Sequence, residues 1–298
     1  MAHAFDEDTA LEPLPDVAPP GGAGSALGFT AGISHRWDTV GPPNGGFLLA
    51  LAARALAEAV PFPDPITVTG HFFRPARHTP VELHVERIRA GKAHASAMAR
   101  LDQDGKEILR ALGTFSDLAA AAGAHGADRS DARPPPLPPP EECLPVQELQ
   151  PRQWDDLPGR LPELYRAIDV RLARPERREP GEIARLEGWM RFADGREPDV
   201  AALPLLADTF PPAVFDIGAG AGVAAWVPTV ELTVHVRGRP APGWIAASFR
   251  TRFLCDGYFE EDGELWDSAG RLVALSRQLA VTRGRRPSAE PATEAAQP

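Results

Sequence analysis

The pattern of apolar positions predicts one buried helix followed by a series of short strands. Residues 45–60 are mostly helix formers and are apolar on nearly every side until Arg54. A helix of this kind has to be buried. The residues after it form short apolar or alternating runs between turn signals, which predicts strands at 66–73, 81–89, 93–101 and 108–115. The first half of the chain is therefore expected to be a helix followed by an antiparallel meander.

The second half shows the same succession, but Pro204, Pro211 and Pro212 interrupt its helical stretch. Strands are expected at 168–173 and 185–192, and a helical stretch opens near Asp199. Further strands are expected to begin at Thr229, Trp244, Tyr258 and Leu272. Residues 229–236 alternate strictly, which predicts a core face with Val230, Leu232, Val234 and Val236 and a polar face with Thr229, Glu231, Thr233 and His235.

The second half also repeats landmarks of the first at a nearly constant distance. His71 and His235 are 164 residues apart, and Gly105 and Gly270 are 165 apart. A unit of this length is a small domain rather than a solenoid repeat. The sequence therefore predicts two copies of one unit, in which the matched histidines serve the architecture rather than the chemistry.

Proline-rich and alanine-rich stretches divide the chain into five parts. We predict an N-terminal extension at 1–27 and a first unit at 28–118. A linker follows at 119–163, because its Pro-rich run lacks the N–H groups that a sheet needs. The second unit is expected at 164–284, and a disordered tail at 285–298.

Composition narrows the range of partners. The chain has 298 residues and a formal net charge of -10, without a cluster of basic residues, which disfavours nucleic acid. Cys143 and Cys255 lack metal-like spacing, so neither a disulfide framework nor a zinc site is expected. No run of 18 apolar residues occurs, which argues against a membrane span, and the acidic N-terminus has no apolar stretch. A cytoplasmic protein is the expectation.

Several motifs, taken in order, resemble the acyl-CoA thioesterase II (TesB-like) family of double-hotdog proteins. They are a Gly45-Gly46 helix start, the His71-Phe-Phe-Arg-Pro75 run, Ala207-Asp208 after a Pro/Leu stretch, Thr229-Val-Glu231, and the run 272–278 that ends in Gln278. The resemblance covers roughly 28–116 and 168–283. It implies an α+β fold of two fused hotdog units, each with a long central helix wrapped by a curved antiparallel sheet.

The resemblance also implies an active site in the second unit only. The family's catalytic Asp, Thr and Gln fall on Asp208, Thr229 and Gln278, with Thr233 as the alternative if the register of Thr229 slips by one residue. In the first copy, the nearest offsets place Pro65 and Gly113 where the second has Thr229 and Gln278. The implied reaction is hydrolysis of an acyl-CoA thioester by an activated water, and it needs no metal or organic cofactor.

Thioester hydrolysis requires these residue types for chemical reasons as well. A base must lie within hydrogen-bond reach of a water, neutral groups must orient that water, and donors must face the developing oxyanion. Asp208 suits the first role, and Thr229 and Gln278 suit the second. Backbone N–H groups at a helix start can supply the third, and Gly45-Gly46 permits close approach there.

Each of these residues also has a structural interpretation. Asp208 is of a type common in turns, and Thr229 is of a type favoured in strands. Gly45-Gly46 can be a simple junction between a loop and a helix. Gln278 is harder to explain in this way, because a long amide among apolar neighbours needs hydrogen-bond partners if it is buried.

Other functions fit the sequence less well. The glycine-rich run 215–222 resembles the cofactor loop of methyltransferases, but it lacks a preceding strand and a following helix. No Gly-x-Ser-x-Gly motif for a serine hydrolase occurs. A non-catalytic acyl-CoA-binding protein of the same fold stays open, whereas a hydratase-type hotdog enzyme would need a His near Asp208. Both a monomer and a homo-oligomer are compatible with a fused double unit.

Overall fold

A computed structural model describes residues 3–15, 26–121, 130–148, 161–173, 184–217 and 227–282. Within these residues, helix α2 (Gly45–Glu58) is the longest helix, and Asn44 caps it by accepting a hydrogen bond from the Phe47 N–H at 2.8 Å. Ten of its fourteen residues are buried. The uniformly apolar sequence of α2 thus corresponds to a helix enclosed by other elements, as predicted.

The strands that the sequence predicted occur in the expected order, with boundaries that differ by a few residues, and the strand at Ala26–Ala31, which was not predicted, precedes α2. The first half comprises β2 (Ala26–Ala31), β3 (Asp64–Phe72), β4 (Val81–Ala90), β5 (Ala95–Gln103) and β6 (Lys106–Ser116). The second half comprises β8 (Ile168–Leu172), β9 (Ala184–Phe192), β10 (Thr229–Val236), β11 (Ile245–Thr251), β13 (Tyr258–Trp266) and β14 (Leu272–Val281), with the two-residue strand β12 (Leu254–Cys255) paired to β13.

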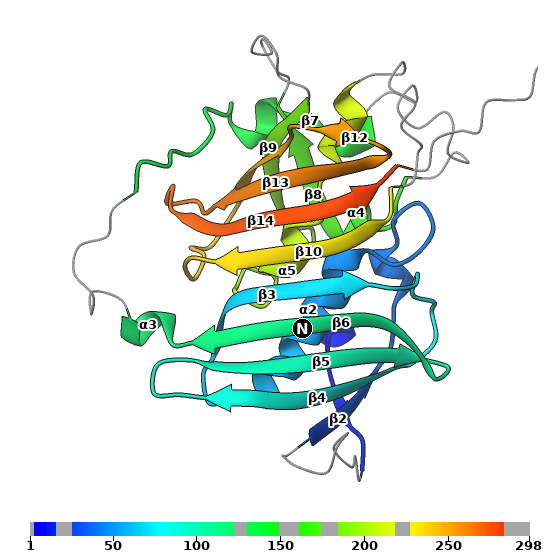
Figure 1. Cartoon of the computed structure of the whole chain (residues 1–298). Coiled ribbons are helices and arrows are strands. Elements are labelled where there is room, and N and C mark those ends of the chain that lie inside the picture. The colour runs from blue at the N-terminus through cyan, green and yellow to red at the C-terminus, as the bar shows by residue number, and fades with distance from the viewer. Residues whose placement is uncertain are drawn as a thin grey trace, which may run out of the picture.

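All these strands form one antiparallel sheet whose second half mirrors the first (Figure 1). From one side the order is β2, β4, β5, β6, β3, and after the centre it continues β10, β14, β13, β11, β9. Strands β3 and β10 pair at the centre, where Thr69 lies opposite Thr233 and their hydroxyls are 2.8 Å apart. These two threonines are 164 residues apart, so the offset in the sequence corresponds to a pseudo-twofold relation between the halves.

A β-bulge changes the face on which Thr229 lies. The pairing of β10 with β14 shifts between Thr229 and Glu231, so Thr229 lies opposite Ala280, and Leu232 lies opposite Gln278. Ala280 and Gln278 are two residues apart on β14 and therefore face the same side. The strict alternation predicted for 229–236 is thus wrong at Thr229, because the extra residue turns this side chain to the inner face. Strand β3 has the same irregularity, between Pro65 and Thr67.

The prediction of a long central helix in each unit is wrong for the second unit. Within the described residues, the position corresponding to α2 holds only helix α5 (Leu203–Leu206) and the short 3-10 helix η5 (Ala213–Ile217). Pro211 and Pro212 lie between them, and consecutive prolines remove N–H donors and clash with the preceding helical turn. Helix α2 packs against both α5 and the strands of its own half.

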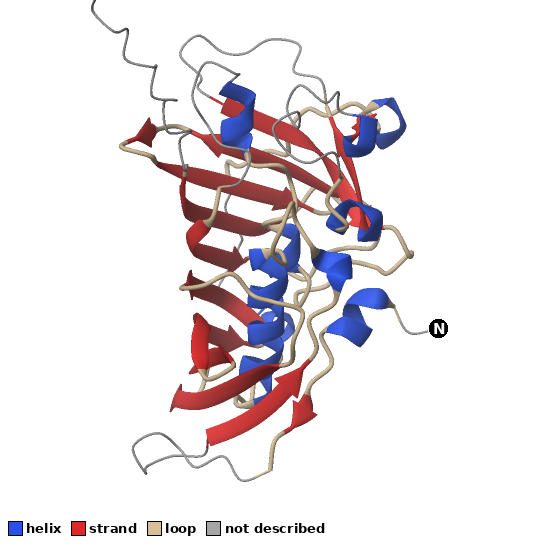
Figure 2. Cartoon of the chain, turned by 90° about the vertical axis from the view of Figure 1, so that its right-hand side faces the viewer, coloured by secondary structure: helices blue, strands red, loops and turns tan. Residues whose placement is uncertain are grey.

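The helices lie on one side of the sheet (Figure 2). The core therefore forms between α2, α5 and the inner face of the strands, and it includes the buried side chains of Leu51, Val68, Leu101, Leu205 and Phe249. No helix in the described parts of the chain is both long and apolar enough to cross a membrane.

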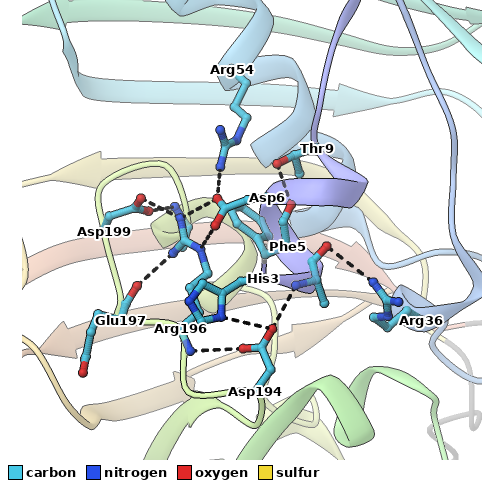
Figure 3. Close-up of polar contacts among 12 residues, drawn as sticks. His3, Phe5, Asp6, Thr9, Arg36, Arg54, Asp194, Arg196, Glu197 and Asp199 are labelled. Atoms are coloured by element: carbon cyan, nitrogen blue, oxygen red, sulfur yellow. Dashed lines mark hydrogen bonds and ion pairs between the residues drawn. The ribbon is translucent and has the colours of Figure 1, made fainter. Parts of the chain in front are cut away.

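The N-terminal extension contains a short helix, α1 (Ala4–Asp8), that the sequence did not predict. Phe5 is fully buried, with its ring 6.0 Å from that of Trp37 and 5.5 Å from that of Phe192. Asp6 accepts hydrogen bonds from Arg54 of α2 and from Arg196 of the second half (Figure 3). Helix α1 therefore contacts both halves, and it is followed by the edge strand β1 (Glu12–Pro13).

The predicted linker also contains ordered elements. Helix α3 (Leu118–Ala121) overlaps its start, and η2 (Pro140–Glu142), β7 (Leu144–Pro145) and η3 (Val146–Glu148) lie within it. Strand β7 pairs with β8 at the edge of the sheet, and helix α4 (Leu164–Ala167) leads into β8. The predicted tail, 285–298, lies outside the described residues.

Candidate active site

A cavity of about 380 Å³ lies where the two halves meet on the inner side of the sheet. Its lining combines apolar side chains with a few polar groups, which is typical of a small-molecule site. The polar groups include three predicted site residues, and the apolar ones come from both halves: Asp208, Thr229, Gln278, Leu48, Phe72 and Phe210. The fold thus brings the predicted trio to one cavity, although Asp208 follows α5 and the other two residues lie on β10 and β14, far apart in sequence.

Asp208 follows α5 and faces the start of α2. Its Oδ2 accepts hydrogen bonds from the Gly46 N–H at 2.8 Å and from Asn44 Nδ2 at 3.1 Å, and its backbone carbonyl accepts from Asn44 Nδ2 at 2.7 Å. A Cβ on Gly46 would lie 2.7 Å from the Asp208 Cβ and 2.6 Å from the Pro204 carbonyl. Glycine at 46 therefore allows the helix start to approach the carboxyl group.

Burial dominates the acidity of Asp208. It raises the pKa of this carboxyl to about 6, against the opposing effect of hydrogen bonds from Gly46, Asn44 and Gly45. Desolvation disfavours the charged form, while donors at a helix start favour it. The resulting pKa lies near neutrality, so Asp208 is ionised at slightly alkaline pH and remains basic enough to accept a proton.

Thr229 and Gln278 are joined in a chain of hydrogen bonds that ends on a second buried carboxyl group. The Thr229 hydroxyl donates to Gln278 Oε1 at 2.7 Å, and Gln278 Nε2 donates to Glu261 Oε1 at 3.1 Å. Glu261 lies directly opposite Gln278 on β13, and its Oε2 accepts from the Ala213 N–H. The buried amide of Gln278 thus has partners at both ends.

Glu261 and Tyr165 respond to the same buried environment. Burial raises the pKa of Glu261 to about 7, and the Ala213 and Gln278 hydrogen bonds oppose this shift. Burial also raises the pKa of Tyr165 above its ordinary value, with added effects from the charges of Asp208 and Glu261. Tyr165 lines the cavity and stays neutral there.

Gly45 and Gly46, predicted to face the oxyanion, lie beside the cavity at the N-terminus of α2. The Gly46 N–H donates to Asp208, and a hydrogen bond from the Gly45 amide also lowers the pKa of Asp208. Both amides therefore act on the carboxyl group in this structure. Their binding of an oxyanion stays a prediction.

Three residues outside the predicted trio have side chains with possible metal ligands close together. His35, Asp38 and His78 place one ligand atom each within 4.8 Å of the others. The imidazole rings are tilted by 31° with centroids 3.5 Å apart, and each faces a different oxygen of Asp38, at 3.0 Å from His35 and 3.2 Å from His78. Each imidazole contacts its own oxygen of the same carboxylate, so this arrangement fits two contacts with Asp38 better than ligands that converge on one metal ion.

The other polar residues considered from the sequence lie elsewhere. Thr233, the alternative to Thr229, faces Thr69 and Glu231 on the outer side of the sheet. His71 and His235 are exposed. The glycine-rich run 215–222 begins within η5 and does not follow a strand, which removes the context of a cofactor loop. Its residues beyond 217 lie outside the described part.

The fold and cavity define a protein of the hotdog class. A conserved protein of unknown function with the hotdog fold, from Alicyclobacillus acidocaldarius, matches with a TM-score of 0.76 over 96% of this chain and 100% of that one, at 25% identity. Models for the N-terminal and C-terminal domains of acyl-CoA thioesterases match residues 33–116 and 140–282. The chain belongs to the acyl-CoA thioesterase family.

Two further proteins resemble this chain over nearly all its length. An uncharacterized protein of Mycobacterium tuberculosis is 27% identical, with 94% of this chain and 99% of the relative covered. A crystal structure of a candidate thioesterase II from Thermobifida fusca has a TM-score of 0.77 and 27% identity, and it covers 95% of this chain and 98% of that one.

Sequence reasoning missed Asn44 and Glu261, although the repeat contained a signal for both. Asn44 precedes a Gly-Gly helix start, where Asn is a preferred cap, and it lies 164 residues before Asp208. The same offset relates Glu261 to Ala97, a fully buried alanine on β5. A carboxyl group in place of a core alanine is the kind of difference that the comparison of the two copies was able to reveal.

Proposed function

We propose that this chain is an acyl-CoA thioesterase built as a double hotdog, with units at 28–118 and 164–284 and one active site between them. The observation that carries the proposal is the cavity that Asp208, Thr229 and Gln278 line together. The matching residues of the first half are Pro65 and Gly113 by the register of the sheet, and Asn44 by the 164-residue offset. They contain neither a carboxyl group nor a hydroxyl, which supports one site per chain.

In the proposed reaction a water molecule bridges Asp208 and Thr229. Asp208 accepts a proton from the water as its oxygen attacks the thioester carbonyl carbon, and a tetrahedral oxyanion forms. The oxyanion collapses, the carbon–sulfur bond breaks, and the electron pair leaves with the sulfur as the CoA thiolate. The proton held by Asp208 can return to the thiolate, which leaves a free acid and CoA as products.

The hydrogen bonds at the start of α2 support the role of Asp208 as base. The Gly45 and Gly46 amides and Asn44 hold the carboxyl group in one orientation, and orientation of a reacting group lowers the barrier. We assign Gly45 and Gly46 this positioning role. Rotation of the carboxyl group during proton transfer would free one amide for the oxyanion, as the sequence predicted.

Two other functions remain as alternatives to be tested. A binding protein would hold acyl-CoA in the same cavity without turnover, but it would not need a buried base with a pKa near 6. A hydratase-type enzyme would need a histidine with Asp208, and among the described residues that line the cavity there is no histidine. Hydrolysis therefore agrees best with the polar groups present.

The experiment is hydrolysis of a series of acyl-CoA substrates of increasing chain length, with thiol release as the readout. We expect turnover of at least one chain length, and a loss of 100-fold or more in kcat for Asp208→Asn and Gln278→Ala. Both variants should still bind the substrate. Absence of turnover on every chain, or unchanged kcat in Asp208→Asn, would refute the proposal.

A further inference from the structure

Glu261 is a carboxyl group buried in the core next to the site, and it does not line the cavity. Burial of such a group is unfavourable unless hydrogen bonds compensate for the lost water. Its two recorded partners are the Ala213 N–H and the amide of Gln278. One of these partners belongs to the proposed catalytic trio, which links the buried charge to the chemistry.

The first half shows that the fold does not require this carboxyl group. Gln278 pairs with Leu232 and Glu261, and in the same register of the first half Gly113 pairs with Val68 and Ala97. A Cβ on Gly113 would lie 2.9 Å from Leu56 of α2, so the long helix fills that space. In the second half the helix is interrupted, and η5 instead presents the Ala213 N–H to Glu261.

The charge of Glu261 fixes which group donates and which accepts in each hydrogen bond from Glu261 through Gln278 to Thr229. An ionised carboxylate only accepts hydrogen bonds, so Gln278 must turn its NH₂ group toward Glu261. Gln278 Oε1 then faces Thr229, and the Thr229 hydroxyl must donate to it. The lone pairs of Thr229 are left to accept a hydrogen bond from the water, whose other hydrogen faces Asp208. The lone pair of the water then remains available for attack.

We propose that Glu261 is a positioning residue that acts through Gln278 to set the hydrogen-bond direction of Thr229 and thereby the orientation of the hydrolytic water. This inference rests on the proposed thioesterase function. Glu261 itself touches neither the water nor the substrate. Its contribution should therefore appear in kcat, with little change in KM.

Glu261→Gln tests this role with almost no change in shape. The new amide must turn its oxygen to the Ala213 N–H, so its NH₂ group faces Gln278. Gln278 then has to flip and donate to Thr229, which turns the Thr229 hydrogen toward the water and occupies the attacking lone pair. At pH 8 we expect kcat to fall by about 10- to 100-fold with KM within about twofold, in line with the cost of a misoriented reactant.

The matched control is Glu260→Gln. Glu260 neighbours Glu261 on β13, is equally buried, and accepts hydrogen bonds from the Arg252 and Phe253 N–H groups instead of Gln278. It should retain wild-type kcat. Glu261→Asp is a second variant that keeps the charge but is too short to reach both Ala213 and Gln278, and it should lose an intermediate part of kcat.

A double-mutant cycle distinguishes positioning from general damage to the fold. If Glu261 acts through Gln278, the double variant Glu261→Gln/Gln278→Ala should have the kcat of Gln278→Ala alone. An effect of Glu261→Gln that persists in full without Gln278, or a wild-type kcat in Glu261→Gln, would overturn the inference.

A second readout does not depend on activity. The side-chain NH₂ resonances of Gln278, assigned by their loss in Gln278→Ala, should shift in Glu261→Gln and stay unchanged in Glu260→Gln. Unchanged resonances in Glu261→Gln would count against the inference even if no acyl-CoA were hydrolysed. Absence of wild-type turnover would instead refute the thioesterase proposal alone.

Discussion

Asn44 and Asp208 are 164 residues apart and hydrogen-bonded to each other, with Asn44 Nδ2 at 3.1 Å from Asp208 Oδ2. The same offset relates Thr69 and Thr233, which meet at the centre of the sheet. The two halves therefore approach each other through corresponding positions. At the cavity, Asn44 has an amide where Asp208 has a carboxyl group. The carboxylate of Asp208 therefore has a hydrogen-bond donor beside it instead of a second negative charge.

Asn44→Asp tests the value of this asymmetry. Aspartate is also a good helix cap and can accept from the Phe47 N–H, so α2 should remain intact. Two adjacent carboxyl groups are difficult to ionise together because their negative charges repel, which should raise the apparent pKa of the pair. We expect the acid limb of the kcat–pH profile to move upward by about one unit or more. An unmoved limb would show that Asp208 does not titrate in this profile.

The proposed function makes the pH dependence of the wild-type protein follow from the pKa values of Asp208 and Glu261. The proposed base is active when ionised, and its pKa is raised to about 6 by burial. Activity should therefore be close to full at pH 8.5. It should begin to fall as Glu261, whose pKa is raised to about 7, takes up a proton and no longer orients Gln278. It should fall at least tenfold per pH unit well below 6, where protonation removes the base. Measurement of kcat between pH 4.5 and 8.5 at saturating acyl-CoA checks this. The part of the limb near pH 6 should be absent from the residual activity of Asp208→Asn.

The contribution of Asp208 to the free energy of unfolding should decrease with rising pH, whereas activity should increase. The folded-state pKa of Asp208 is above its usual value of 3.8, so the folded protein binds this proton more tightly than the unfolded chain does. The stability gained from that proton is fully present below about pH 4 and is lost as the pH rises through about 6. Asp208→Asn should thus be more stable than wild type at pH 8, by about 1–3 kcal/mol, and by much less at pH 4. Urea unfolding of both proteins at the two pH values measures the difference.

The sequence predicted most of the strand order, because turns at Gly105 and Gly270 and the alternation of apolar residues are local signals. Both glycines have positive φ, at 69° and 72°, in the turns that close corresponding hairpins. The bulge at Val230 was not predictable in this way. Strand alternation alone places Thr229 on the outer face, and only the pairing with β14 shows that it turns inward.

The trio of the site came from the family resemblance and was not implied by residue spacing. Asp208, Thr229 and Gln278 lie on three separate elements, so the sequence contains no local motif that joins them. The partners of these residues required the tertiary structure, because Asn44 and Glu261 act through contacts across the halves and across neighbouring strands. The prediction of a long helix is wrong in the second half. The composition there favours a helix, but Pro211-Pro212 ends it because proline rings clash with the preceding helical turn.

Thr229→Val tests the inward turn of Thr229. Valine preserves the shape and removes the hydroxyl, so the Gln278 amide loses its donor and the water loses a partner. We expect kcat to fall about 10- to 100-fold, with most of the activity retained in Thr229→Ser. Thr233→Val is the matched control on the same strand, because its hydroxyl faces the outer side. If Thr233→Val were the impaired variant, the assignment of the threonine would be wrong.

Phe5 gives a prediction for the N-terminal extension. Its ring is fully buried against Trp37 and Phe192, and Arg54 and Arg196 lie over it at 5.2 and 4.8 Å from the centroid. Removal of a buried ring leaves a cavity in the core, so Phe5→Ala should lower the free energy of unfolding by about 3–5 kcal/mol.

The exposed Glu7 of the same helix supplies the control, and Glu7→Ala should leave stability within about 0.5 kcal/mol of wild type. Chemical denaturation of both variants checks the pair. Because α1 contacts Arg54 in the first half and Arg196 in the second, Phe5→Ala should weaken the attachment of both halves to this helix. Equal stability of Phe5→Ala and Glu7→Ala would show that α1 does not hold the halves together.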